Sequence, residues 1–445
     1  MMNRRSLLLM FAALCLLWRL PAALAEETPL QAGPMLGYAD MFEVKVWLQT
    51  TSAHAVYLSY RDMQGGAEMK SETIETSRAT AFTALFVLDR LEPGRRYSYE
   101  VYVDGRKQRF DYATEFSTQK LWQYREDPPA FNVALGSCAF INDSTYDRPG
   151  NPYGGEYHIF KSIAAKKPDV MVWLGDNVYF REPDWNTFSG MAYRYTHGRG
   201  IPEMQELLAT CNHLAIWDDH DFGPNDADGS FWNKETALEV FKLFWANPSY
   251  GFGDMPGVTS KAEWNDVDIF LLDNRYNRSP NNRKTGKRQI LGDEQLEWLI
   301  SALTFSDAPF KLVCIGGQVL NPVARYENYA NYNEERARLL AEIEQNNISG
   351  VVFVSGDRHH SDISKMNRSG TYPLHEITVS PLTSGTYGKS NEPNYFRVEG
   401  TSVGQRNFAV LSFSGPKDER VMDIRIYSSD GTELVAHSIK ANELR

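Results

Sequence analysis

Hydrophobic and polar residues alternate along the first quarter of the chain, after an apolar N-terminal segment. β-Branched and aromatic residues recur there at nearly every second position, in residues 43–50, 55–62, 80–91 and 95–105. Such alternation predicts half-buried β-strands, and turns rich in Gly, Pro and Asp separate them. Several short strands at this spacing favour an all-β sandwich of the immunoglobulin or fibronectin type over residues 28–120.

The pattern changes after Pro128 and Pro129, which we expect to stiffen a linker. Short, continuous apolar runs now predict buried strands, in residues 131–138, 169–176, 213–221, 267–275, 310–318, 350–360 and 376–385. Apolar residues at helical spacing lie between them, in residues 154–167, 233–247, 292–304 and 333–345. Strands that alternate with helices predict an α/β layered domain, which we place at residues 130–445. Residues 408–415 and 420–439 are expected to be antiparallel strands that complete it.

Residues 1–25 have the pattern of a signal peptide. Arg4 and Arg5 precede an apolar core, and Ala23 and Ala25 form an A-x-A cleavage site. The core is too short to span a bilayer, so we expect a periplasmic or secreted protein without a transmembrane helix in the mature chain. Both the ordinary secretory route and the twin-arginine route fit this segment.

The net charge and the cysteine content limit the binding partners and the disulfides that we expect. A formal net charge of −11 over 445 residues argues against nucleic acid as a partner, and no nucleic-acid-binding signature is present. A phosphorylated substrate remains compatible, because a bound cation reverses the sign of a pocket. Of the cysteines beyond the signal peptide, we expect Cys211 and Cys314 to be core residues and no disulfide framework to form. We expect a monomer.

Candidate metal ligands follow the predicted strands of the second domain. Ligands gather at the carboxyl ends of strands in open α/β sheets, so these residues should converge on one place. They are Cys138, Asp176 and Tyr179, the acidic run 218–221, and Asp357, His359 and His360. The stretch 217–226 holds Asp218, Asp219, His220 and Asp221 directly after a buried run, and lacks the EF-hand spacing. Buried carboxylates require compensation, which favours cations over an acidic surface loop.

Two further strand ends leave alternatives open. Arg275, two residues after Asp273, is either a catalytic residue that contacts the substrate phosphate or a partner in a salt bridge. Gln318 is a weaker candidate at the next strand end.

Taken together, these motifs resemble the alkaline phosphatase D family of metallophosphatases. The motifs are G-S-C, G-D-x-x-Y, W-D-D-H-D with N-D following, D-x-R, L-G-x-x-Q-x-x-W-L and S-G-D-x-H-x-S, in that order. The resemblance extends from about residue 30 to the C-terminus. It implies a four-layer αββα domain of the calcineurin-like superfamily behind the β-sandwich, with a dinuclear metal centre that hydrolyses phosphate monoesters and diesters.

The same resemblance implies roles for individual residues. Asp176 would bridge two metals, with Cys138, Tyr179 and His359 on a ferric ion and Asp219 and Asp357 on the second metal, which would be calcium. Zinc, manganese and magnesium remain alternatives, since oxygen donors favour several hard ions. His220 would contact the substrate phosphate and protonate the leaving oxygen.

Two alternative functions remain beside an alkaline phosphatase. One is a phospholipase D-like phosphodiesterase, which depends on the pocket walls. Residues 188–200 are expected to form a wall loop, and the aromatic segment 241–253 is either wall or core. The other is a non-enzymatic calcium-binding adhesion protein, which would not explain Cys138, Tyr179 and His220 at strand ends.

Overall fold

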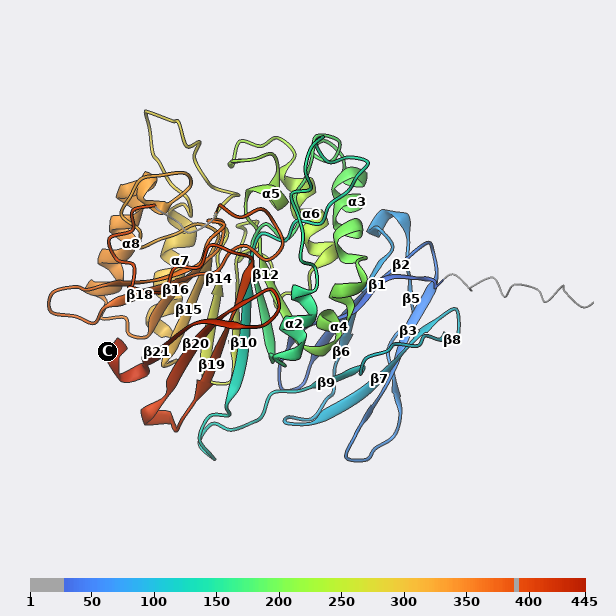
Figure 1. Cartoon of the computed structure of the whole chain (residues 1–445). Helices are drawn as coiled ribbons and strands as arrows, with labels where there is room; N and C mark the ends of the chain where they lie inside the picture. Colours follow the sequence, from blue (N-terminus) through green and yellow to red (C-terminus); the bar gives the residue numbers. More distant parts are fainter. Residues whose placement is uncertain (1–27, 388–391) are drawn as a thin grey trace, which may run out of the picture.

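The computed structural model describes residues 28–387 and 392–445 (Figure 1). The signal peptide expected at residues 1–25 lies outside this part of the chain. Within the described residues, no helix is both long and apolar enough to cross a membrane.

A nine-stranded mixed sheet forms the centre of the molecule. Its order is β21-β20-β19-β10-β11-β12-β1-β2-β6. The strands are β1 (Leu30–Ala39), β2 (Val44–Thr50), β6 (Thr83–Leu88), β10 (Phe131–Gly136), β11 (Val170–Leu174), β12 (Asn212–Ile216), β19 (Asn407–Ser414), β20 (Val421–Ser428) and β21 (Glu433–Lys440). β10, β11 and β12 are parallel and buried on both faces, which explains their continuous apolar sequences.

A second sheet faces the first. Its order is β13-β14-β15-β16-β18-β17. The strands are β13 (Ser260–Trp264), β14 (Val267–Leu271), β15 (Phe310–Ile315), β16 (Val351–Ser355), β17 (Asp362–Met366) and β18 (Leu374–Thr378). Side chains of both sheets, such as Leu135 and Ile269, belong to one buried apolar cluster. The sheets therefore pack face to face.

Helices cover the outer faces of both sheets (Figure 1). They are α2 (Ile159–Ala165), α3 (Phe188–Arg199), α4 (Pro202–Thr210), α5 (Asp219–Phe222), α6 (Lys234–Phe244), α7 (Asp293–Phe305) and α8 (Asn333–Gln345). α2, α3, α4 and α6 pack with Met171 and Trp173 on the nine-stranded sheet, whereas α7 and α8 share the cluster of the second sheet. The order is helix, sheet, sheet, helix, as expected from the sequence.

The N-terminal segment is all-β, but the expected self-contained immunoglobulin-like sandwich is not confirmed. β1, β2 and β6 belong to the nine-stranded sheet, and β1 pairs in parallel with β12 at Leu36 and Asn212. The remaining strands form a separate small sheet: β3 (Ala55–Asp62), β4 (Met69–Lys70), β5 (Ile74–Glu75), β7 (Arg96–Val103), β8 (Arg106–Lys107) and β9 (Glu115–Ser117). Main-chain pairing therefore crosses the expected domain boundary.

Of the two segments considered as pocket walls, one differs from the expectation and one matches an alternative. Residues 188–200, expected to be a loop, form helix α3, which the Thr187 hydroxyl caps by accepting a hydrogen bond from the Gly190 N–H at 3.1 Å. In the segment 241–253, Phe241 and Trp245 are fully buried beneath the nine-stranded sheet. This segment is therefore largely core, which was one of the two alternatives.

Candidate metal centre and its pocket

The carboxyl ends of parallel strands from both sheets bring the predicted ligands together. Cys138 follows β10, Asp176 follows β11 and Asp219 follows β12. From the second sheet, Asp357 and His359 follow β16. Residues more than 200 positions apart thus meet at one edge of the fold.

Cys138, Asp176 and His359 form the first cluster. One donor atom from each lies within 4.8 Å of the others, and all three residues are buried. The Tyr179 hydroxyl donates to Asp176 Oδ2 at 3.1 Å and lies 3.4 Å from His359 Nε2. The four residues that the resemblance assigned to a ferric ion are therefore adjacent.

Asp176 also belongs to a second cluster, with Asp219 and His220. Asp176 Oδ1 accepts the backbone N–H of His220 at 3.2 Å, so its two oxygens face different groups. A third cluster joins Asp218 and Asp219 to Glu327. Because Asp176 is common to two clusters, its carboxylate lies where a bridging ligand would be needed.

The buried acidic groups of these clusters require a positively charged partner. Burial and the neighbouring Asp176 raise the pKa of the Cys138 thiol and of the Tyr179 phenol well above their usual range. Burial, together with the charges of Asp219 and Asp218, also raises the pKa of Asp176. Cations in this position would reverse those effects and make thiolate, phenolate and carboxylates the stable forms. The donor set therefore fits a pair of bound metal ions.

Left-handed backbone conformations also occur at the residues of these clusters. Four of the clustered or neighbouring residues have left-handed φ values: Cys138 (59°), Asp176 (52°), Asp357 (62°) and His359 (53°). Each such residue costs about 1–3 kcal/mol and persists only where the surroundings enforce it. Such strain concentrates at functional sites.

Serines and main-chain groups orient the first cluster. His359 Nδ1 lies 2.6 Å from the Gly385 carbonyl, which fixes the proton on Nδ1 and leaves Nε2 free to act as a ligand. The Ser380 hydroxyl accepts the His359 N–H at 2.9 Å and donates to Cys138 Sγ at 3.2 Å. Sequence reasoning did not identify Ser380, because a serine after a strand carries no distinctive signal.

Arg275 does not reach the substrate side of the site. It is fully buried, and its guanidinium bonds to Asp218, to Glu327 and, at 3.1 Å, to the Ala227 carbonyl. With its donors occupied by protein groups, the salt-bridge alternative replaces the predicted contact with phosphate. Arg275 is a positioning residue for Asp218 and Glu327.

Glu327 was missed by sequence reasoning. It lies in the loop after β15, within a stretch that has no motif. Its Oε1 also forms an ion pair with Arg278 Nη2 at 2.9 Å, so two arginines hold it beside Asp218 and Asp219.

Other candidates have structural contacts. Asp273 Oδ1 accepts from the Trp217 indole at 2.8 Å and from the Arg275 N–H at 2.9 Å. Asp221 Oδ1 accepts the Asp218 N–H at 2.6 Å, which closes the turn that presents Asp219. Gln318 is fully buried and donates to the Thr378 hydroxyl at 3.0 Å.

Asp357 lies next to the clusters without belonging to them. Its carboxylate raises the pKa of Asp176 and of Asp218, yet it is in none of the three groups with donor atoms within 4.8 Å. Arg358 Nη1 lies 3.4 Å from Asp357 Oδ2.

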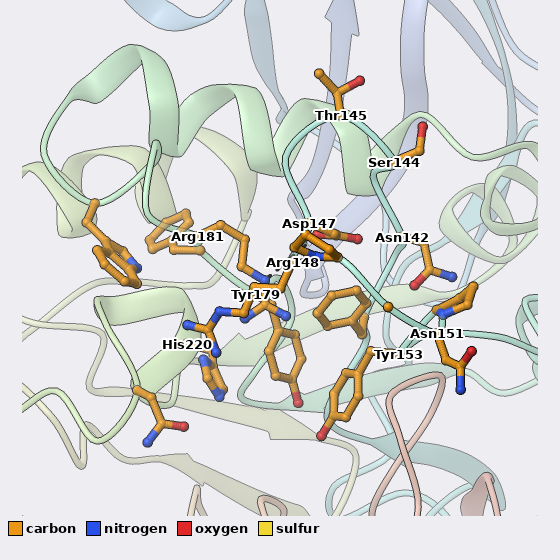
Figure 2. A pocket seen from close by; sticks show the side chains of 17 residues that line it. Asn142, Ser144, Thr145, Asp147, Arg148, Asn151, Tyr153, Tyr179, Arg181 and His220 are labelled. Atoms are coloured by element: carbon orange, nitrogen blue, oxygen red, sulfur yellow. Dashed lines mark ion pairs between the residues drawn. The ribbon is translucent and has the colours of Figure 1, made fainter.

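An open pocket of about 1070 Å³ borders the first two clusters (Figure 2). Tyr179 and His220 form one part of its wall, and the loop of residues 142–153 forms another. Aromatic residues and arginines complete it: Phe140, Phe180, Trp185, Arg148 and Arg181. A molecule in this pocket would contact His220 and Tyr179 together.

His220 has a pKa below its usual range. Burial lowers its pKa; Asp219, with Oδ2 3.8 Å from His220 Nε2, opposes this shift, and the charges of Arg181 and Arg275 reinforce it. Its Nδ1 is buried and has no hydrogen-bond partner among the described residues. Its ring packs on Tyr179, with centroids 4.3 Å apart.

Comparison with known proteins agrees with this geometry. The sequence profile described as PhoD-like phosphatase matches residues 254–418. Alkaline phosphatase D of Bacillus subtilis (strain 168) is 23% identical over 328 residues, which are 63% of this chain and 53% of that protein. The chain therefore spans about half the length of this curated relative. A solved structure entitled "Structure of PhoD" superposes with a TM-score of 0.75 at 17% identity and covers 94% of this chain and 92% of its own. Residues 254–418 thus match the PhoD-like phosphatase family, and the chain as a whole is similar to PhoD in its fold.

The PhoD-like fold extends to a more distant phosphatase. Purple acid phosphatase PPD1 from yellow lupin (Lupinus luteus) seeds superposes with a TM-score of 0.65 at 11% identity, over 92% of this chain and 74% of its own. At such identities the likeness shows the fold alone. A separate profile, a domain of unknown function (DUF7800), matches residues 27–121, which include strands β1 to β9.

Proposed function

We propose that the protein hydrolyses phosphate esters at a dinuclear metal centre. The observation that carries this proposal is the pair of clusters joined by Asp176, with Cys138 and His359 on one side and Asp219 and His220 on the other. Both border an open pocket that can hold an organic ester. The match of residues 254–418 to the PhoD-like phosphatase family supports the same reaction.

We further propose iron(III) and calcium as the two metals. Cys138, Tyr179, His359 and Asp176 would hold the iron, because thiolate and phenolate are anionic donors for a highly charged ion. Asp176, Asp219 and Asp357 would hold the calcium, a hard ion that prefers oxygen. When bound, the two ions would neutralise phosphoryl charge and make water a better nucleophile.

The residues of the chain have their own roles in this reaction. The backbone N–H groups of His220 and Asp226 hold Asp176 Oδ1 and Asp219 Oδ2 at 3.2 and 2.7 Å, so both carboxylates are fixed before substrate arrives. Because the pKa of His220 is lowered, its imidazole is neutral at alkaline pH. Its contribution is then an N–H hydrogen bond to the departing oxygen, which strengthens as charge develops there.

The alternative functions make different demands on the site. A phospholipase D-like diesterase would need room for two ester groups, and the pocket is large enough for a bulky substrate. A calcium-binding adhesion protein would need only carboxylates, and would leave unexplained why Cys138, Tyr179 and His359 meet. The donor set therefore favours an enzyme.

Export is also part of the proposal, and it rests on the sequence of residues 1–25. Mass spectrometry of the mature N-terminus would test it, with cleavage expected after Ala25.

Metal analysis joined to turnover tests the central proposal. Protein purified without added metal would be analysed for bound elements, then assayed with p-nitrophenyl phosphate and bis-p-nitrophenyl phosphate. Asp176→Asn should lose metal and activity together, because it removes the ligand common to both clusters. Asp430→Asn, at the exposed β20–β21 turn, is the matched control and should keep both. Full turnover by metal-free protein, or by Asp176→Asn, would refute the proposal.

A further inference from the structure

Arg181 is a pocket residue that the reaction described so far does not use. It follows Phe180 on the loop after β11, two positions beyond Tyr179, and lines the pocket with Tyr179 and His220. Figure 2 shows Arg181 at the same end of the pocket as Tyr179 and His220. An arginine so placed lines the pocket that the proposed ester substrate would enter.

The guanidinium of Arg181 lacks hydrogen-bond acceptors. Among residues 28–387 and 392–445, it makes no hydrogen bond to a protein oxygen, and its Nε is buried without a partner. The nearest carboxylate oxygen, Asp147 Oδ1, is 3.8 Å away and also lies 3.5 Å from Arg194. Yet the side chain of Arg181 is only 12% exposed. A buried cation with open N–H groups is costly unless a ligand completes it.

Neighbouring arginines are satisfied differently. Arg148, on the same pocket, donates to Glu182 Oε1 at 2.8 and 3.0 Å. Arg194 donates to Asp184 Oδ2 at 2.8 Å, and its Nη2 is buried without a partner. Of these three arginines, Arg181 is the one whose guanidinium makes no hydrogen bond to a protein oxygen in the described part of the chain.

Ring packing alone does not account for Arg181. Its guanidinium carbon lies 4.7 Å from the centre of the Phe140 ring and 5.9 Å from that of Tyr179. These contacts supply no oxygen acceptor for the N–H groups of Arg181. They place the guanidinium near the Tyr179 ring, whose hydroxyl donates to Asp176 Oδ2.

We propose that Arg181 binds the non-bridging oxygens of a phosphate monoester and makes the site prefer monoesters over diesters. This inference rests on the proposed phosphoesterase function and specifies its substrate class. Above about pH 6 a monoester carries two negative charges on phosphorus, whereas a diester carries one. A further fixed cation therefore favours the monoester, and the forked guanidinium matches two phosphoryl oxygens.

The test compares Arg181→Gln with the parent protein on the two p-nitrophenyl esters at pH 8–9. A hydrogen-bonded charge contact of this kind corresponds to about a 10- to 100-fold fall in kcat/KM for the monoester. The diester should fall less than about 3-fold, because it lacks the second charge. Arg181→Lys should recover part of the loss, since it keeps the charge but not the fork.

Controls separate substrate binding from damage to the fold. Arg181→Gln should keep its metal content. Arg425→Gln, which removes an equal charge from the β20 surface where Arg425 pairs with Glu433 at 3.2 Å, should match the parent protein. Equal losses on both esters would overturn the inference.

A binding measurement keeps the inference independent of turnover. Titration of the metal-loaded proteins with inorganic phosphate should show a Kd weakened about 10-fold or more in Arg181→Gln. If the parent protein hydrolysed neither ester, the proposed function would fail, and this titration would still decide the role of Arg181. An unchanged phosphate Kd would overturn it in either case.

Discussion

Replacement of Arg275 by methionine distinguishes a role in positioning Asp218 and Glu327 from a role in binding the substrate phosphate. The variant removes a fully buried cation that bonds to Asp218 and Glu327 and lies 3.7 Å from Asp219 Oδ1. Breaking a buried ion pair leaves uncompensated charge and costs about 3–5 kcal/mol. For a chain of 445 residues, this corresponds to a fall in Tm of about 3–6 °C.

Calorimetry on metal-free protein at pH 8 would measure this fall, and the same melts at pH 5 should show a smaller one. At the lower pH, protonation relieves part of the charge left on Asp218, whose pKa burial raises. Adding Glu327→Gln to the variant should restore some stability, because one of the orphaned carboxylates is then neutral. An unchanged Tm together with a large loss of kcat/KM for phosphate esters would refute this reasoning and return Arg275 to a substrate-binding role.

Three further predictions address other groups. His220→Ala should retain its metals, because the contact of His220 with Asp176 is made by its backbone N–H. Its kcat should fall about 10²–10³-fold. Metal analysis and kinetics on the same samples check this prediction, and metal loss would contradict it. Cys138→Ser should abolish or shift the visible absorption expected of iron bound by thiolate and phenolate, and an unchanged spectrum would exclude Cys138 as a ligand. Burial lowers the pKa of His213 to about 3, so between pH 6.5 and 3 only the unfolded chain takes up a proton there and stability falls as pH falls. His213→Gln lacks this proton uptake, so its stability deficit in urea titrations should be about 2 kcal/mol smaller at pH 5 than at pH 8; equal deficits would contradict it.

The second domain could be predicted closely from sequence because its signals are local. Continuous apolar runs marked β10, β11, β12 and β16, and each is followed by a group with unusual chemistry. The rule that ligands gather at carboxyl ends of strands then brought Cys138 and His359 together without knowledge of the strand order. The structure agrees with that placement.

Features that depend on distant parts of the chain were not predictable in the same way. The burial of Arg275 depends on Glu327, 52 residues later in a loop without a pattern. Helix α3 contains Gly190 and Gly198 and several aromatic residues, all weak helix formers, and packing on the sheet outweighs these propensities. Helix α4 did carry a start signal, Pro202 at its first turn, which was overlooked.

The parallel pairing of β1 with β12 predicts the effect of an N-terminal truncation. Residue Asn212 also donates through its amide to the Gly37 carbonyl at 2.6 Å, so the first strand is joined to the one that leads into Asp218 and Asp219. Deleting the residues before position 121 would remove β1, which pairs with β12. The exposed edge of a hydrophobic strand would then favour self-association. The N-terminal segment therefore supports part of the candidate metal centre.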